Sequence, residues 1–330
     1  MPVKTTAFTA ARHGFHFANA FKNNIQVIAG FPPITTYGLC GGMSFAALDY
    51  YHENLPIPNH VAGAFPDKEV PPNGRLRGYI FQRQVDSFNP LKNPDMVKFV
   101  TQKLPVPFGR SAFDVTIQDE FPLLVKAIDA GTPVPLGLIA DSANPADCHQ
   151  VVAVGYDTRT AMKVQIWDCN HPDKALTLEL DAASSLVKES TGEKWVGFCL
   201  QTYSKSIPSY VDVRLASGIH SHPPVATLGR PVSVGFSVRN DGDHDVHISS
   251  LDASLTGPQG ENLDGSFRKD GIGTNLVAGA TQSYLATNNS FGISPGRYTA
   301  VAWYQSARGE WFKVPPGEPG TQTATRVRTA

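Results

Sequence analysis

Residues 37–51 place a cysteine in a glycine-rich turn that runs directly into an apolar stretch. Gly38, Gly41 and Gly42 allow the backbone to bend sharply and to approach neighbouring groups closely. From Met43 onward, helix-forming residues with apolar side chains at helical spacing predict a helix. Because this helix is apolar on nearly every side, we expect it to be buried in the centre of its domain.

Cys40 lies at or just before the N-terminus of this predicted helix. The partial positive charge and the unpaired N–H groups at such a terminus stabilise a thiolate, which is the nucleophilic form of cysteine. A nucleophilic cysteine needs a base, and the base needs a third group that orients it. The sequence should therefore contain both partners elsewhere.

Both partners occur on two predicted strands that follow each other closely. Residues 148–157 predict a β-branched strand that begins with His149. Residues 164–172 predict a second strand that ends in Asp168 and Asn170. A short hairpin between the two strands would bring Asp168 beside His149.

Three motifs occur in order: Gly-Leu-Cys-Gly-Gly at a helix start, His-Gln-Val-Val-Ala-Val-Gly-Tyr-Asp on a strand, and Trp-Asp-Cys-Asn-His-Pro at the next strand end. Together they resemble the papain-like cysteine peptidase superfamily, and its bacterial C39-like branch in particular. The resemblance covers roughly the first 200 residues, a usual domain size. It implies that Cys40 is the nucleophile, His149 the general base and acid, and Asp168 the residue that orients His149. Asn170 is the alternative for this third role.

The sequence departs from that family pattern at the oxyanion hole. Papain-like enzymes usually carry a glutamine about six residues before the nucleophile, and this chain has Ile34 there. The oxyanion donor must then come from elsewhere, and the candidates are Asn19, Asn24, Gln26 and the backbone N–H of Cys40. Among the side chains we favour Asn19.

The length of 330 residues suits two domains. Residues 1–203 carry the papain-like resemblance, and residues 204–224, with proline, glycine and a His-Ser-His-Pro-Pro cluster, predict a linker. Residues 225–330 contain short alternating strands separated by Gly, Asn and Asp turns, which predict a β-sandwich. This part resembles bacterial Ig-like domains in architecture only, since it has no cysteine. The expected fold class is α+β: a central helix packed on an antiparallel sheet, followed by an all-β sandwich.

Further elements are expected around the motifs of the first domain. Residues 119–131 predict a helix with acidic residues in its first turn and a glycine at its end. Residues 133–140 and 176–180 predict strands, and residues 182–190 predict a short helix. Residues 195–203 predict the last strand of the antiparallel sheet.

The cysteines and histidines do not predict a metal site. Four cysteines are present, all in the first 200 residues, and a catalytic Cys40 leaves an odd number for disulfides. Cys148, His149, Cys169 and His171 are ligand types for zinc. However, Cys148 and His149 are adjacent on a strand and point to opposite faces. We therefore expect neither a metal nor another cofactor.

The composition narrows the class of partner. The net charge is −1 and charged residues make up 17% of the chain, so no basic excess indicates nucleic acid and no charge run indicates a membrane surface. No stretch approaches 18 consecutive apolar residues. The first residues lack the apolar core of a signal peptide, so we expect a cytoplasmic protein or one exported by a signal-independent route.

Three functions remain open from the sequence. The first is a cysteine peptidase or amidase that acts on peptide or protein substrates through a thioester with Cys40. The second is a papain-fold deamidase or acyltransferase that uses the same three residues. The third is a non-enzymatic protein that binds a protein partner through the Ig-like domain. The aromatic residues Trp303, Tyr304, Trp311 and Phe312 are expected in the core of that domain, with strand alternation deciding which face each one takes.

Overall fold

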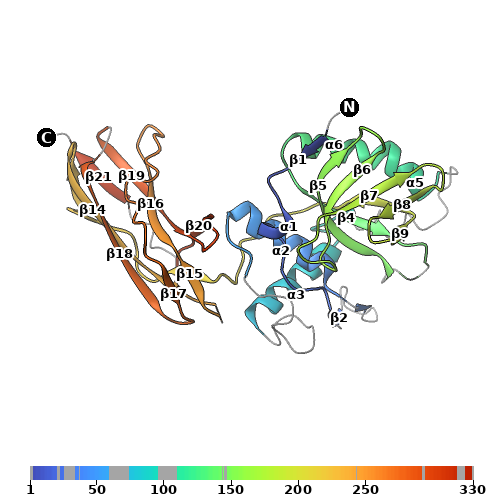
Figure 1. The fold of residues 1–330 in the computed structure, drawn as a ribbon, viewed down its shortest axis with the longest axis horizontal. Coiled ribbons are helices and arrows are strands. Elements are labelled where there is room, and N and C mark those ends of the chain that lie inside the picture. Colours follow the sequence, from blue (N-terminus) through green and yellow to red (C-terminus); the bar gives the residue numbers. More distant parts are fainter. Residues whose placement is uncertain are drawn as a thin grey trace. The chain divides into compact units, whose positions relative to one another are not determined.

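The chain divides into two compact units in the computed structural model (Figure 1). The first unit comprises Met1–His52 and Asn59–Ser209, and the second comprises Glu53–Pro58 and Tyr210–Ala330. Each unit has its own buried apolar core. The structure describes residues 3–20, 23–25, 34–36, 38–58, 74–95, 110–142, 144, 147–242, 244–291, 294–317 and 324–328.

An eight-stranded antiparallel sheet forms the framework of the first unit. Its strand order is β10-β4-β5-β6-β7-β8-β9, and β1 pairs with β5. The expected mixture of helices with an antiparallel sheet is thereby confirmed. The strands are β1 (Val3–Thr5), β4 (Val134–Ile139), β5 (His149–Asp157), β6 (Lys163–Trp167), β7 (Leu176–Asp181), β8 (Leu186–Glu189), β9 (Lys194–Trp195) and β10 (Gly197–Leu200).

The hairpin of β5 and β6 has the geometry that the sequence predicts. Asp157 pairs with Lys163 at the turn, and Val152 pairs with Trp167 near the other end. Asp168 follows directly after β6, so it comes beside the first residue of β5, which is His149. Val151 and Val152 of β5 are buried and Val154 is half-buried, as expected of a strand in the middle of a sheet.

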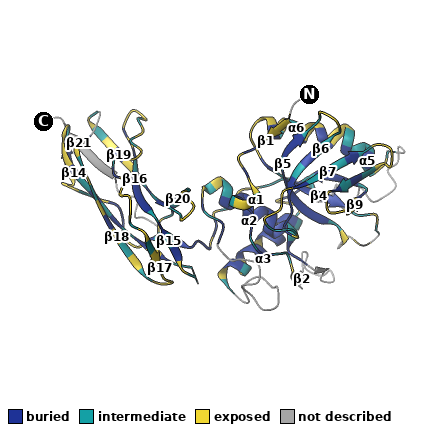
Figure 2. Cartoon of the chain, viewed as in Figure 1, coloured by how far each residue is buried: buried dark blue, intermediate teal, exposed yellow. Residues whose placement is uncertain are grey.

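Helix α2 (Cys40–Glu53) is the buried helix of this unit, and Figure 2 shows it in the colour of buried residues. Every residue from Gly41 to Tyr50 is buried, which confirms the prediction of a central helix. The other helical elements are α1 (Ala10–His13), α3 (Arg75–Phe88), α5 (Ala112–Val115), the π-helical turn η1 (Thr116–Glu120) and α6 (Phe121–Asp129). The strands β2 (Asn23–Ile25) and β3 (Ile34–Thr36) pair with each other, apart from the main sheet. Among the described residues no helix is long and apolar enough to span a membrane.

A buried carboxylate anchors α2 to its neighbours. Asp49 accepts hydrogen bonds from Arg83 Nε (2.7 Å), from Tyr79 Oη (2.6 Å) and from Tyr203 Oη (2.7 Å). The backbone N–H of Ser206 donates a further bond at 2.8 Å. A buried charge is tolerated when it is paired and fully hydrogen-bonded. These bonds therefore fix α2 against α3 and against residues 203–206.

Two predictions for the first unit and its boundary were wrong. Residues 182–190 form a turn followed by β8 rather than a helix, because Val187 and Glu189 face inward while Leu186 and Lys188 alternate with them. Residues 204–224 do not form a simple linker. Their first part bonds within the first unit, and β11 (Val213–Leu215) and β12 (His220–His222) pair with a strand of the second unit.

The second unit contains two main sheets around one core. A four-stranded sheet has the order β11-β14-β12 with β18 on β14, and a five-stranded sheet has the order β13-β21-β19-β16 with β20 on β19. Buried side chains of both sheets form a single cluster, with Phe236 and Tyr284 from one and Leu251 and Tyr304 from the other. The remaining strands are β13 (Val225–Thr227), β14 (Arg230–Asn240), β15 (Val246–Ile248), β16 (Ser250–Thr256), β17 (Thr274–Leu276), β18 (Thr281–Phe291), β19 (Gly296–Gln305), β20 (Trp311–Val314) and β21 (Ala324–Arg328).

Candidate active site

Cys40 is the first residue of α2 and is half-buried. The glycines after it allow the first turn of the helix to approach its neighbours closely. A Cβ at Gly41 would lie 1.6 Å from Gln150 Oε1, and a Cβ at Gly42 would lie 2.2 Å from the backbone oxygen of Ile80. Only glycine fits at such distances, so the cysteine is held at the junction of α2, α3 and the start of β5.

Two of the backbone N–H groups at the start of α2 have side-chain acceptors. The N–H of Leu39 donates to Asn19 Oδ1 at 2.6 Å, and the N–H of Gly42 donates to Gln84 Oε1 at 2.7 Å. The first bond inside the helix runs from Met43 N–H to the Leu39 oxygen at 2.8 Å. The N–H groups of Cys40 and Gly41 lie between these, among those that a helix leaves without an intrahelical acceptor.

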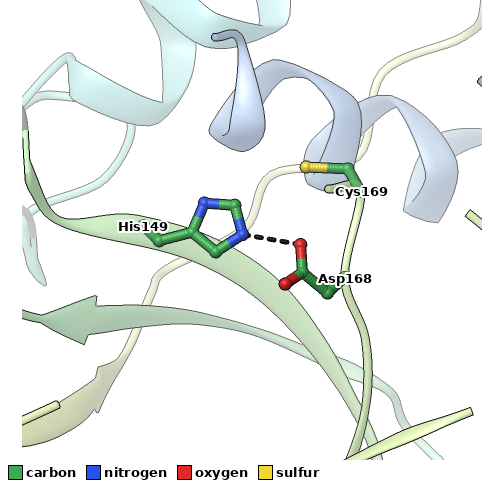
Figure 3. Close-up of side chains that lie close together, drawn as sticks. All are labelled: His149, Asp168 and Cys169. Atoms are coloured by element: carbon green, nitrogen blue, oxygen red, sulfur yellow. Dashed lines mark hydrogen bonds and ion pairs between the residues drawn. The ribbon is translucent and has the colours of Figure 1, made fainter. Parts of the chain in front are cut away.

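His149 lies between an acid and the cysteine. Its Nε2 atom lies 2.6 Å from Asp168 Oδ1, and the neighbouring Cys40 side chain contributes to raising its pKa. Figure 3 shows the second ring nitrogen pointing away from Asp168 toward the pale blue helical ribbon. The ring stacks on Trp195 with centroids 6.1 Å apart. The structure thus brings Cys40, His149 and Asp168 together, as the sequence predicts.

The surroundings of His149 favour its charged form. Burial alone would lower the pKa of His149, but the negative charge of Asp168, its hydrogen bond and the contact with Cys40 raise this pKa well above 6.5. Burial would raise the pKa of Asp168, yet the charge and hydrogen bond of His149 and the N–H of Asn170 keep it below its ordinary value. The pair is therefore a carboxylate and an imidazolium at neutral pH.

The side chain that contacts His149 is that of Asp168, whereas that of Asn170 contacts Asn19. The Asn170 side chain is exposed, and its Oδ1 accepts from Asn19 Nδ2 at 3.1 Å. Its backbone N–H donates to Asp168 Oδ1 at 2.7 Å. Asn170 therefore supports the carboxylate that contacts His149.

Asn19 connects the cysteine turn to the segment after β6. Besides its bonds to Leu39 and Asn170, its N–H donates to the backbone oxygen of Cys169 at 3.0 Å. A Cβ at Gly38 would lie 2.4 Å from Asn19 Nδ2, so this contact requires glycine. The candidate Gln26 and the side chain of Asn24 lie outside the described residues.

The other cysteines differ from Cys40. All four are free thiols, in agreement with the expected lack of a disulfide framework. Cys169 is fully buried, and burial together with the charges of Asp168 and Cys40 raises its pKa well above 9. Cys148 is half-buried like Cys40, and Cys199 is buried.

Glu189 is a feature of the site that the sequence analysis missed. Its side chain is 4% exposed, and its Oε2 accepts a long 3.4 Å bond from Trp195 Nε1. Burial and then the charges of Asp168 and Glu193 raise the pKa of Glu189 to about 7. Its inward position on an alternating strand is the signal that could have found it.

Two groups of side chains, which share Asp168, contain residue types that bind metals. The first group is His149, Asp168 and Cys169, and the second is Asp168, His171 and Glu189. Within each group the donor atoms lie within 4.8 Å of one another. The first group fits an ion poorly. His149 and Asp168 bond each other, and the raised pKa of Cys169 keeps it a thiol, whereas a metal binds the thiolate. A metal ion in the second group would lie beside the imidazolium of His149. The two positive charges would repel each other, so this group also fits a metal ion poorly.

Comparisons with known proteins do not assign a family. No family model and no curated protein matches the chain. One match is the C-terminal domain of wzt, at 10% identity and a TM-score of 0.28. The alignment covers 36% of this chain and 75% of the wzt chain. A second match is Pseudomonas fluorescens alkylpurine DNA glycosylase AlkC, at 15% identity and a TM-score of 0.26. It covers 36% of this chain but only 30% of the glycosylase chain. These scores are too low to assign a fold or a function.

Proposed function

We propose that this chain is a papain-like cysteine hydrolase that cleaves peptide or amide bonds. One observation carries the proposal: His149 bonds to Asp168 and neighbours Cys40, and both residues favour its charged form. A thiol beside an imidazolium that is itself held by a carboxylate is the arrangement of an activated cysteine nucleophile.

In the first half of the reaction, the Cys40 thiolate attacks the carbonyl carbon of the substrate. The positive charge of His149 and the N-terminus of α2 both stabilise the thiolate before attack. The tetrahedral intermediate then collapses to a thioester, and His149 gives its proton to the leaving amine. Asp168 stabilises the imidazolium and orients its ring.

The negative charge that develops on the carbonyl oxygen needs donors close to Cys40. We assign this role to the backbone N–H of Cys40 and to Asn19 Nδ2. Asn19 Nδ2 has two hydrogens and uses one for Asn170, while its Oδ1 is bonded to the residue before Cys40. Asn19 thus takes the place of the glutamine that Ile34 replaces.

In the second half, neutral His149 takes a proton from water, and the hydroxide attacks the thioester carbonyl. The carboxylic acid product leaves, and the Cys40–His149 pair is restored. If another amine attacks in place of water, the same residues catalyse acyl transfer.

For the second unit we propose an Ig-like β-sandwich architecture. The support is the pair of sheets whose alternating side chains fill one core. The unit contains none of the four cysteines, so its stability depends on that core.

The proposed function is tested by alkylation of the native protein with iodoacetamide between pH 5 and pH 9, read by mass spectrometry for each cysteine. Cys148 is a matched internal reference because it is half-buried like Cys40. An ordinary thiol with a pKa of about 8.5 is under about 1% thiolate at pH 6. We expect Cys40 to react at least about tenfold faster than Cys148 at that pH.

The variant His149→Ala should bring the rate of Cys40 down to that of Cys148. If Cys40 reacts no faster than Cys148 in the unmodified protein, the nucleophile is not activated and the proposed hydrolase is wrong. If Cys40 is fast but His149→Ala leaves the rate unchanged, the activation comes from α2 alone and the assigned base is wrong.

A further inference from the structure

The outer face of the five-stranded sheet in the second unit carries a group of polar and aromatic side chains. On β16, Leu251 and Leu255 are buried in the core. Asp252 and Ser254 alternate with them and point to the opposite face. A carboxylate and a hydroxyl thus lie side by side on the face away from the core.

The neighbouring strands add two indoles to this face. Tyr304 on β19 and Phe312 on β20 belong to the core, with ring centroids 5.8 Å apart. Trp303 and Trp311 alternate with them and are only half-buried. Trp303 is the cross-strand partner of Asp252, so their side chains are neighbours. The prediction that these aromatic residues lie in the core is thus confirmed for Tyr304 and Phe312 and wrong for Trp303 and Trp311.

The segment after β16 folds over this face and forms a wall. The backbone N–H of Gly265 donates to Asp252 Oδ2 at 3.2 Å. The Ser254 hydroxyl donates to Asp264. These bonds connect the segment to β16 at two points.

The guanidinium of Arg268 completes the wall. Its central carbon lies 4.9 Å from the centroid of the Trp311 ring, within cation–π distance. Together with Trp303 and the residues of the wall, it lines a cavity of about 310 Å³ that is open on one side. This volume is at the lower end of the range of small-molecule sites.

Two buried polar atoms at the cavity have no hydrogen-bond partner among the described residues. They are Asp252 Oδ1 and Trp303 Nε1. The Asp252 side chain is more than nine-tenths buried, so water does not compensate freely. Native proteins rarely leave such atoms unsatisfied. A ligand that donates to Asp252 Oδ1 and accepts from Trp303 Nε1 would therefore satisfy both atoms.

The charges of the cavity restrict the ligand. A cation would meet the guanidinium of Arg268, which already covers one face of Trp311, although Asp270 Oδ1 pairs with Arg268 Nε at 2.6 Å. An anion would meet the carboxylates of Asp252 and Asp264. A neutral ligand with several hydroxyl groups avoids both repulsions, and each hydroxyl can donate and accept.

We propose that this cavity is a saccharide-binding site, formed by Asp252, Arg268, Trp303 and Trp311. The apolar face of a sugar ring would stack on an indole. Its hydroxyl groups would donate to Asp252 Oδ1 and accept from Trp303 Nε1. The ligand class is a neutral oligosaccharide. This proposal does not depend on the chemistry of Cys40.

The test is binding of the full chain to an array of neutral oligosaccharides built from glucose, mannose, galactose, xylose or N-acetylglucosamine. The best binder is then titrated by calorimetry. We expect one class to bind at a single site. Arg268→Ala removes a charged donor and should weaken binding about tenfold or more. Arg297→Ala is the matched control, since it lies six residues from Trp303 on β19 and is exposed, and it should leave binding unchanged.

A second variant separates a sugar from a cation. Asp252→Asn keeps an acceptor oxygen and removes the charge, so it should retain most of the saccharide affinity. Tetramethylammonium chloride is the cationic probe. If it binds and Asp252→Asn abolishes this, while no sugar on the array binds, the proposal is overturned. Sugar binding that survives both Arg268→Ala and Trp311→Ala would also overturn it.

Discussion

The Nε2 atom of His149 lies 2.6 Å from Asp168 Oδ1, and this bond leaves the second ring nitrogen for Cys40. In Asp168→Asn the charge that holds His149 protonated is lost, while the shape of the side chain is kept. We expect acylation by p-nitrophenyl acetate to fall by about 10²–10⁴-fold, the usual range for general acid–base catalysis. The rate of p-nitrophenol release measures this directly.

Asn170→Ala is the control for that variant, because it removes the competing amide and keeps the backbone N–H that supports Asp168. Its acylation rate should fall much less than that of Asp168→Asn. The reverse order would make Asn170 the orienting residue.

Asn19 is expected to act on the oxyanion and not on the thiolate. Acylation by p-nitrophenyl acetate builds negative charge on a carbonyl oxygen, whereas alkylation by iodoacetamide does not. Asn19→Ala should therefore lower the acylation rate by about 10²–10³-fold and change the alkylation rate of Cys40 far less. Asn144→Ala, at an exposed surface site, is the control. Equal losses in both reactions would mean that Asn19 only holds the turn at Leu39.

The grouping of Cys40, His149 and Asp168 was predictable because it depends on local rules. A glycine turn before an apolar helix sets the position of the cysteine, and a short hairpin sets His149 beside the end of the next strand. These relationships need only the period of a strand and the direction of a helix. Alternation alone does not separate Asp168 from Asn170, because they are two residues apart; the contacts of their side chains do.

Other features depend on contacts between distant segments, and local patterns do not contain them. Gln84 caps the Gly42 N–H from another helix, and nothing in its own segment marks it for this role. Glu189 lies in the segment 182–190, for which the sequence predicts a short helix, but strand pairing places its side chain inside. Strands β11 and β12 lie in the segment whose prolines and glycine predict a linker, and each forms through pairing with the distant β14.

Two glycines give a matched test of close packing in the first unit. A Cβ at Gly42 would lie 2.2 Å from the backbone oxygen of Ile80, so Gly42→Ala forces α2 and α3 apart. We expect a loss of about 1–3 kcal/mol in the free energy of unfolding, typical of overpacking. Gly78 lies inside α3 with nothing within 4 Å of its Cβ position, so Gly78→Ala should add about 0.5–1 kcal/mol.

Unfolding of the first unit can be followed alone by fluorescence. Trp167 and Trp195 are buried there, whereas the other two tryptophans belong to the second unit. In a background of Trp303→Phe and Trp311→Phe, urea titration then reports the first unit. Equal effects of the two glycine variants would contradict the tight contact at Ile80.

Glu189 should make the stability of the first unit depend on pH. Burial and then the charges of Asp168 and Glu193 raise its pKa from 4.5 to about 7, against the Trp195 bond and the charge of His149. A carboxyl whose pKa is raised in the folded state binds its proton more tightly there than in the unfolded chain. Its contribution therefore favours folding below pH 4.5 and is lost as the pH rises through about 7.

Glu189→Gln keeps the shape of the side chain and cannot ionise. Its free energy of unfolding relative to the unmodified protein should rise between pH 4.5 and pH 8, by up to about 3 kcal/mol, because one pKa unit corresponds to about 1.4 kcal/mol. Urea titrations at several pH values in the same fluorescence background measure this difference. Glu179→Gln on β7 is the control: its side chain is 44% exposed and its ion pair with Lys163 is open to solvent, so its difference should change far less with pH. If the two variants give parallel curves, the pKa of Glu189 is the same in the folded and the unfolded protein, and burial beside Asp168 does not raise it.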